Sequence, residues 1–277
     1  MLHHEPKSCF VDTPHGKLHY LDWPANERSR GDVLLLHGFS QTCHSWDEFA
    51  AHLCEDHHVI ALDQRGHGES SWGGSQDAYS REQMVHDAWG IAPDHSAVIG
   101  MSMGGAHAIA LAAQYPQRYR CIVIVDYVPG VDRQTTQRVW EFSRLCWNSF
   151  EEAVQVVHVF NARRSLENIR TRLRHSLYQR PDGMWTWRVD PALAMHPRFN
   201  DPSEVMWQRA AQVQCPALMV HGGDSDIVTL AAAQRMAQTL PKGRLISIEG
   251  AGHSVPGDNP EAFYAVVKPF LDEFLHG

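Results

Sequence analysis

The sequence predicts an α/β fold with a doubly wound, mostly parallel sheet, and two patterns carry this prediction. Six short, almost continuously apolar runs are typical of strands that are buried on both faces of a parallel sheet. Stretches with helical spacing separate most of these runs, and alternation of strand and helix indicates helices on both faces of one sheet. With 277 residues, of which 43% are apolar, the chain is long enough for one such domain with an insertion.

The predicted elements follow one another along the chain. An antiparallel hairpin is expected first, because residues 8–13 and 17–23 flank the turn Pro14-His15-Gly16. The buried strands are expected at residues 33–37, 59–63, 97–100, 121–126, 217–221 and 245–249. The main helices are expected at residues 46–54, 81–89, 103–115, 230–240 and 260–275. Asn259 suits the N-cap of the last helix, and Pro260 suits its first position.

One segment interrupts this alternation. Residues 132–212 are rich in charge and in helical spacing, so we expect a helical cap inserted between two parts of the core, 1–131 and 213–277. Within it, residues 180–183 form the turn signal Arg-Pro-Asp-Gly. Its tryptophans could cover an apolar substrate pocket, but a small core of the cap itself is the favoured interpretation, because a short insertion has few other ways to bury area. These tryptophans are Trp140, Trp147, Trp185, Trp187 and Trp207.

Composition excludes several classes of function. The formal charge of -8 disfavours nucleic acid and anionic membranes, which are bound through excess Lys and Arg. No apolar run approaches the roughly twenty residues that span a bilayer, and residues 1–6 do not have the character of a secretory signal. The six cysteines are scattered without a CxxC pair, which favours reduced thiols and a cytoplasmic location. We expect a small-molecule substrate as partner and either a monomer or a homodimer.

The nineteen histidines raise the question of a metal site. None of them falls into an HxxxH or HExxH spacing in a convincing context, so the sequence predicts neither a metal site nor a cofactor. The segment Asp63-Gln64-Arg65-Gly66-His67-Gly68 lacks the GxGxxG and GxxxxGK patterns of phosphate-binding loops. We therefore expect a structural turn there, with Arg65 paired to a carboxylate.

Ser102 is the candidate nucleophile. It stands in Gly100-Met101-Ser102-Met103-Gly104, after a predicted strand and before a helix of small residues, which is the context of a nucleophile elbow. A serine on such a sharp turn has strained backbone geometry, and glycine two positions away on either side removes the clash. A serine hydroxyl also needs a nearby base, and His253, in a glycine-containing loop after the last predicted strand, is the candidate.

The imidazole needs a carboxylate to hold its tautomer, and three aspartates compete for this role. Asp224 and Asp226 follow the strand at residues 217–221, and Asp126 ends the strand before it. We favour Asp226 on the chain order serine, acid, histidine, and Asp126 and Asp224 remain alternatives.

The oxyanion that develops during acyl transfer needs preorganised donors, which backbone N–H groups commonly supply. Met103 follows the serine directly and is the first candidate. The second is Phe39, because the loop after residues 33–37 begins His37-Gly38-Phe39 and Gly38 lets the chain turn.

With these motifs the chain resembles the α/β-hydrolase superfamily, in its subgroup of esterases, lactonases and carbon-carbon bond hydrolases with a helical cap. The segments HGFSQ, DQRGHGES, GMSMGG, GGDSD and GAGHSVP occur in the order of that family. The resemblance implies that Ser102 attacks the substrate, that His253 acts as base and acid, and that the cap shapes the substrate site. Epoxide hydrolases and haloalkane dehalogenases carry aspartate at the elbow, so Ser102 argues against those activities.

The leading hypothesis is a carboxylesterase-like serine hydrolase of EC 3.1.1 type. It would cleave a carboxylic ester or lactone of a small apolar substrate through an acyl-enzyme on Ser102. A carbon-carbon bond hydrolase, an amidohydrolase or a cofactor-free oxygenase on the same fold is the alternative. A ligand-binding sensor without turnover is the hypothesis from a different class.

Overall fold

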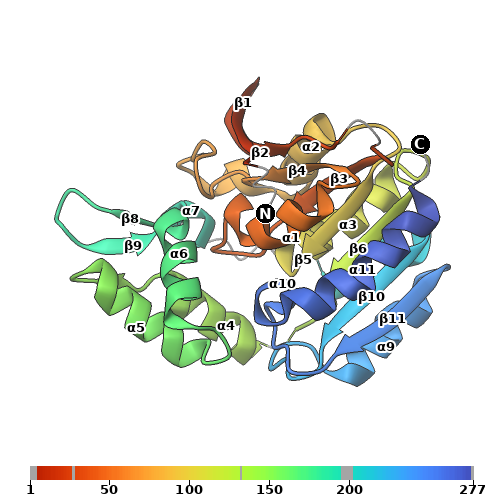
Figure 1. Ribbon diagram of the computed structural model, residues 1–277. Helices are drawn as coiled ribbons and strands as arrows, with labels where there is room; N and C mark the ends of the chain where they lie inside the picture. Colours follow the sequence, from red (N-terminus) through yellow and green to blue (C-terminus); the bar gives the residue numbers. More distant parts are fainter. Residues whose placement is uncertain (1–4, 27–28, 132, 195–201, 276–277) are drawn as a thin grey trace.

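A single eight-stranded sheet organises the fold. The computed structural model describes residues 5–26, 29–131, 133–194 and 202–275. The strand order is β1-β2-β4-β3-β5-β6-β10-β11 (Figure 1). All neighbours from β4 to β11 pair in parallel, whereas β1 and β2 add an antiparallel edge. The predicted doubly wound, mostly parallel sheet is therefore confirmed.

The strands agree closely with the apolar runs of the sequence. Every residue of β5 and β6 is buried, which explains why these runs show no polar alternation. The predicted N-terminal hairpin is also present, and its turn uses Gly16 at a φ of 119°. The strands of the large sheet are β1 (Lys7–Thr13), β2 (Gly16–Trp23), β3 (Asp32–Leu36), β4 (His58–Leu62), β5 (Ala97–Met101), β6 (Cys121–Val125), β10 (Ala217–Gly222) and β11 (Gly243–Ile248).

Helices cover both faces of the sheet. The helices outside the insertion are α1 (Asp47–Leu53), α2 (Arg81–Ile91), α3 (Met103–Gln114), α9 (Leu230–Thr239), α10 (Val255–Asp258) and α11 (Pro260–Phe274), with short 3-10 turns η1 (Cys43–Trp46) and η2 (Gln76–Tyr79). In β3, Leu34 and Leu36 pack into an apolar cluster with α2, α3 and α9, while Val33 and Leu35 pack into a second cluster with α1 and α11. Alternate side chains of one strand thus supply two cores.

The insertion between β6 and β10 contains more than helices. It comprises α4 (Arg133–Ser143), β7 (Cys146–Trp147), α5 (Phe150–Phe160), α6 (Leu166–Ser176), β8 (Leu177–Gln179), β9 (Trp185–Trp187), α7 (Pro191–Ala194) and α8 (Ser203–Gln212). The strands β7, β9 and β8 form a small antiparallel sheet. The sequence pattern did not predict it, because strands of two or three residues are too short to show a period. The expected turn at residues 180–183 joins β8 to β9, with Gly183 at a φ of 87°.

The insertion has an apolar cluster of its own. Trp147 and Trp187 are buried in it and meet edge to face, with ring centroids 5.6 Å apart. Trp207 of α8 instead packs against the cluster that contains α3, so α8 lies against the main core. Figure 1 shows α4, α5, α6 and the β8–β9 hairpin at one side of the large sheet. Residues 132 and 195–201 of the predicted cap lie outside the described residues, and the division at 1–131, 132–212 and 213–277 stays a prediction.

Among the helices that the structure describes, none combines the length and apolar character needed to cross a membrane.

The turn after β4 is held by a buried ion pair. Arg65 donates from Nε and Nη2 to the two carboxylate oxygens of Asp87 in α2, at 2.6 and 2.5 Å. Both side chains are about 4% exposed, so the expected pairing of Arg65 with a carboxylate is present. Near this turn three histidines are completely buried: His37, His67 and His107. Burial lowers the pKa of all three, in the case of His67 to about 3.

These histidines predict a loss of stability in mild acid. In the unfolded chain a histidine takes up a proton near pH 6.5, whereas His67 and His107 stay neutral in the folded protein well below that pH, and the pKa of His37 is lowered as well. Stability is therefore fully present above about pH 7 and falls below it, by about 1.4 kcal/mol per neutral histidine between about pH 7.5 and about pH 5.5. Burial lowers the pKa of His44 and His58, but their aspartate partners raise it above the ordinary value. These two histidines therefore offset part of the loss of stability in acid.

Urea unfolding at the two pH values measures this effect. The variant His67→Gln serves as control, because its loss of stability is expected to be smaller than that of the parent protein by about 1.4 kcal/mol. A free energy of unfolding that does not fall towards pH 5.5 would contradict the assignment of neutral buried histidines.

Candidate active site

Ser102 occupies the strained turn that the sequence predicts. It follows β5 and precedes α3, with φ 51° and ψ -114°, a conformation that L-residues adopt rarely. A Cβ on Gly100 would lie 2.0 Å from the carbonyl oxygen of Gly104, and a Cβ on Gly104 would lie 2.1 Å from that of Leu36. Glycine is therefore required at both positions.

His253 pairs with Asp126, across 127 positions of sequence. Its Nδ1 lies 2.7 Å from Oδ2 of Asp126. The Asp126 side chain is completely buried, whereas that of His253 is 21% exposed. A hydrogen bond to the carboxylate assigns the proton of the neutral imidazole to Nδ1 and leaves Nε2 as an acceptor. The ring is thus held in one tautomer by a carboxylate that water does not reach.

The aspartate that the sequence favoured has a different position. Asp226 is exposed, and among the hydrogen bonds of the described residues none joins it to His253. Asp224 is exposed as well and forms an ion pair with Arg163 at 3.3 Å. The geometry therefore corrects the expected pairing from Asp226 to Asp126, which was one of the alternatives.

The loop after β10 supplies hydrogen-bond donors to Asp126. The backbone N–H of Gly222 donates to Oδ1 of Asp126 at 3.0 Å, and the Ser225 hydroxyl donates to Oδ2 at 2.6 Å. Ser225 is itself oriented by the N–H groups of Ile227 and Val228, which donate to its oxygen. The motif Gly-Gly-Asp-Ser-Asp thus orients a carboxylate that belongs to the neighbouring strand.

The register of the strands contains a signal that points to Asp126 as the partner of His253. Met101 of β5 pairs with Val125 of β6, so the next residues, Ser102 and Asp126, leave the same edge of the sheet side by side. Both have positive φ, 51° and 47°, and both donate their backbone N–H across to the neighbouring strand, Ser102 to Val125 and Asp126 to Val220. A polar residue that ends the strand next to the elbow was therefore the better candidate.

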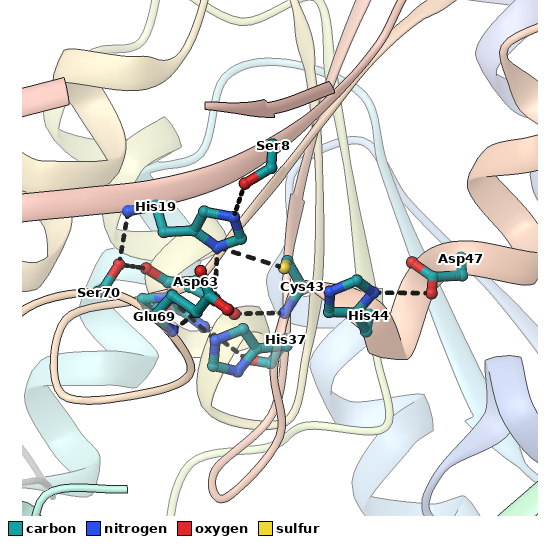
Figure 2. A network of polar contacts seen from close by, with 10 residues as sticks. Ser8, His19, His37, Cys43, His44, Asp47, Asp63, Glu69 and Ser70 are labelled. Carbon is teal, nitrogen blue, oxygen red and sulfur yellow. Dashed lines mark hydrogen bonds and ion pairs between the residues drawn. The ribbon is translucent and has the colours of Figure 1, made fainter. Parts of the chain in front are cut away.

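The loop of Phe39 is fixed at both ends by residues that follow β4. His37 Nε2 accepts from the backbone N–H of Gln64 at 3.0 Å, and the backbone N–H of Cys43 donates to Oδ1 of Asp63 at 2.7 Å. Figure 2 shows Asp63 at the centre of this network, between His19 and Cys43. The loop that carries Phe39 is therefore preorganised by buried hydrogen bonds.

Ser102 and His253 line one cavity of about 410 Å³. This volume suits a small molecule. Both predicted oxyanion residues, Phe39 and Met103, line the same cavity, which brings all these candidates except Asp226 to one place. The remaining walls are largely apolar and include Met101, Val128, Val139, Trp140 and Ile227.

A second cavity of about 560 Å³ adjoins the first. Phe39 and His253 line both, so the two spaces meet at the candidate base. Its walls come from the insertion and from the loops after β10 and β11, and they carry several arginines and aspartates.

Two clusters of side chains outside the cavities place potential metal ligands close together. In the first, His19, Cys43 and Asp63 are completely buried (Figure 2). Burial would raise the pKa of Asp63, but hydrogen bonds and the nearby histidines hold it at about 2, while burial raises the pKa of the Cys43 thiol. The Cys43 thiol is therefore protonated, and the Asp63 carboxylate already accepts several hydrogen bonds. Hydrogen bonding explains why these side chains lie close together. In the second, His44 stacks on His175 and contacts Asp47, at the junction of η1 and α6.

Comparison with known proteins gives consistent results. The family model described as "Alpha/beta hydrolase family" matches residues 33–266. The chain is similar to the esterase Rv0045c of Mycobacterium tuberculosis, with 28% identity over 252 residues that cover 87% of this chain and 82% of the relative. It is also similar to 2-(acetamidomethylene)succinate hydrolase of Mesorhizobium japonicum, with 25% identity over 258 residues that cover 89% and 91%.

A solved structure agrees with the fold. The crystal structure of E-2-(acetamidomethylene)succinate hydrolase superposes with a TM-score of 0.85 at 21% identity, and the match covers 97% of this chain and 100% of that chain. The curated relatives that are named esterases and hydrolases support a hydrolase.

The glycine requirement around Ser102 can be tested by Gly100→Ala. The new methyl group would collide with backbone atoms that cannot move away without distorting the elbow, so we expect a loss of about 2 kcal/mol or more in the free energy of unfolding. The matched control is Gly90→Ala in α2, where an added Cβ meets nothing within 4 Å. There, alanine is expected to be neutral or slightly stabilising. Equal stability of the two variants would show that the elbow is not constrained as described.

Proposed function

The chain belongs to the alpha/beta hydrolase family, and we propose that it is a serine hydrolase that cleaves a carboxylic ester or lactone, with Ser102, His253 and Asp126 as its triad. The observation that carries this proposal is the hydrogen bond of His253 to the buried Asp126, at the edge of the cavity that Ser102 also lines. The proposal corresponds to a carboxylesterase of EC 3.1.1 type.

The proposed reaction begins with proton transfer from Ser102 to Nε2 of His253. Asp126 keeps Nδ1 protonated and stabilises the imidazolium, and it does not itself take up the proton. The serine oxygen attacks the substrate carbonyl, and His253 then donates the proton to the departing alcohol. Water, activated by the same imidazole, hydrolyses the acyl-enzyme and restores Ser102.

The oxyanion of each tetrahedral intermediate would be stabilised by the N–H groups of Met103 and Phe39. Met103 is the first residue of α3, so its N–H belongs to the helix end that has no carbonyl partner within the helix and that favours negative charge. Phe39 would contribute the second donor from the loop that His37 and Cys43 anchor.

The insertion is proposed to act as the cap over this site. Val139 and Trp140 of α4 line the cavity of Ser102, so the insertion contributes walls to the space where the substrate would bind. The apolar lining would accept the hydrocarbon part of a small ester by excluding water from it.

A second candidate keeps the triad and changes the bond. The similarity to 2-(acetamidomethylene)succinate hydrolase supports hydrolysis of a bond other than a simple ester. Carbon-carbon bond hydrolysis and amide hydrolysis belong to this candidate. Turnover of 1,3-diketone or amide substrates, with simple esters left intact, would favour it over the ester hydrolase.

The role of Ser102 is tested by labelling and turnover. A fluorophosphonate probe should label the parent protein on Ser102 and leave Ser102→Ala unlabelled, and p-nitrophenyl ester turnover should fall by roughly 10³-fold or more in that variant. Full activity in Ser102→Ala would refute the proposal. Tight ligand binding without multiple turnover in the parent protein would support a sensor instead.

The role of the acid is tested by a matched pair of substitutions. Asp126→Asn should lower kcat by roughly 10³-fold to 10⁴-fold, because the amide cannot hold the imidazole in the required tautomer or stabilise its charged form. Asp226→Asn makes the same change, from carboxylate to amide, at an exposed position. It should leave ester turnover within a few-fold of the parent. Circular dichroism checks that both variants fold. The reverse pattern would assign the acid to Asp226.

A further inference from the structure

Four arginines line the wall of the second cavity. This cavity adjoins the candidate active site at His253 and Phe39. Three of its arginines lie on the loop between α5 and α6 and on α6 itself, and one lies on α4. They are Arg138, Arg163, Arg164 and Arg172. The aspartates of the same cavity are Asp224, Asp226 and Asp258.

Two of these arginines already have carboxylate partners. Arg164 donates from Nε to Asp258 at 2.8 Å, and its Nη2 donates to the carbonyl oxygen of Ser254 at 3.1 Å. Arg163 pairs with Asp224 at 3.3 Å. Arg164 thereby holds the loop that carries His253, and these contacts leave Arg138 and Arg172 as the cations without a carboxylate among the ion pairs of the described residues.

Arg172 has the more unusual environment. Its Nη2 donates to the carbonyl oxygen of Ser45, a neutral partner. A Cβ on Gly257 would lie 2.0 Å from Nη1 of Arg172 and 2.4 Å from Nη2 of Arg164, so the two guanidiniums are close neighbours. Burial, and secondly the charge of Arg164, lower the pKa of Arg172, although a guanidinium remains charged at neutral pH.

The two adjacent guanidiniums repel each other and are poorly solvated, and Arg172 has no carboxylate in direct contact among the ion pairs of the described residues, although the charges of Asp47, Glu48 and Asp258 act on it in part. An anion at this point would relieve both effects, and a carboxylate is well matched because it accepts two parallel N–H bonds from a guanidinium. Asp226 does not fill this role, because its side chain is exposed and water screens its charge.

We propose that Arg172, beside Arg164, binds a carboxylate of the substrate, so that the protein prefers esters that carry a free carboxylate away from the scissile bond. This inference rests on the proposed ester hydrolysis. The apolar cavity of Ser102 would then hold the hydrocarbon part of the substrate, and the adjoining arginine cavity would hold its charged end.

The test compares two esters of equal chain length. One is p-nitrophenyl hexanoate, and the other is the p-nitrophenyl monoester of adipate, which ends in a carboxylate. After subtraction of the rate with Ser102→Ala, we expect kcat/KM for the adipate monoester to exceed that for the hexanoate by about tenfold or more. The ratio of the two values should fall about tenfold in Arg172→Gln, because the charge-assisted hydrogen bond is lost.

The matched control is Arg174→Gln, because Arg174 is an exposed arginine of the same helix that does not line the cavity. This variant should keep the parent ratio, which excludes a general effect of the net charge. Binding of adipate to Ser102→Ala, followed by calorimetry, gives a readout that does not need turnover. It should weaken about tenfold when Arg172→Gln is added. Thermal unfolding checks that Arg172→Gln, which also loses the contact to Ser45, remains folded.

The outcomes separate the inference from the function on which it rests. Turnover of the hexanoate without preference for the adipate monoester, or an unchanged ratio in Arg172→Gln, overturns the inference and leaves the ester hydrolase intact. Adipate binding that depends on Arg172, without turnover of either ester, supports the carboxylate site and removes the proposed ester reaction.

Discussion

The site is built around the strained backbone of Ser102, which lies at a φ of 51° where β5 turns into α3. This turn is possible because Gly100 and Gly104 have no Cβ. The backbone around them, including the carbonyl of Leu36, packs so closely that a Cβ would not fit. The neighbouring strands β3 and β6 must therefore hold β5 firmly, and their buried apolar side chains do so. The strain of one residue is thus sustained by the core of the whole sheet.

The same sheet determines how the other groups reach the serine. Asp126 leaves β6 beside Ser102, and the loop of Phe39 leaves β3 on the other side of β5. Each of these segments is held by hydrogen bonds, from Gly222 and Ser225 to the carboxylate of Asp126 and from the backbone N–H of Cys43 to the carboxylate of Asp63. The candidate groups at this edge therefore lie on strand ends that hydrogen bonds hold in place, and His253 is oriented by Asp126 from a loop that Arg164 also holds.

The insertion contributes walls to both cavities above the sheet. Its α4 contributes Trp140 to the apolar cavity of Ser102, whereas α6 contributes Arg172 to the charged cavity. Arg164 links the insertion to the loop of His253 through Asp258 and Ser254. Movement of the insertion would therefore disturb both cavities and the candidate base.

The sequence by itself determined the fold and most of the candidate site. Continuous apolar runs such as those at Val33 and Cys121 predict buried parallel strands, because a strand that is covered on both faces has no polar side. Ser102 was identifiable because its strain requires glycines at fixed spacing. The tertiary structure decided that His253 contacts Asp126 and not Asp226, because strand register and loop path place a carboxylate, and chain order does not describe them. It also decided that Arg164 and Arg172 meet at Gly257, because only packing brings separate segments together.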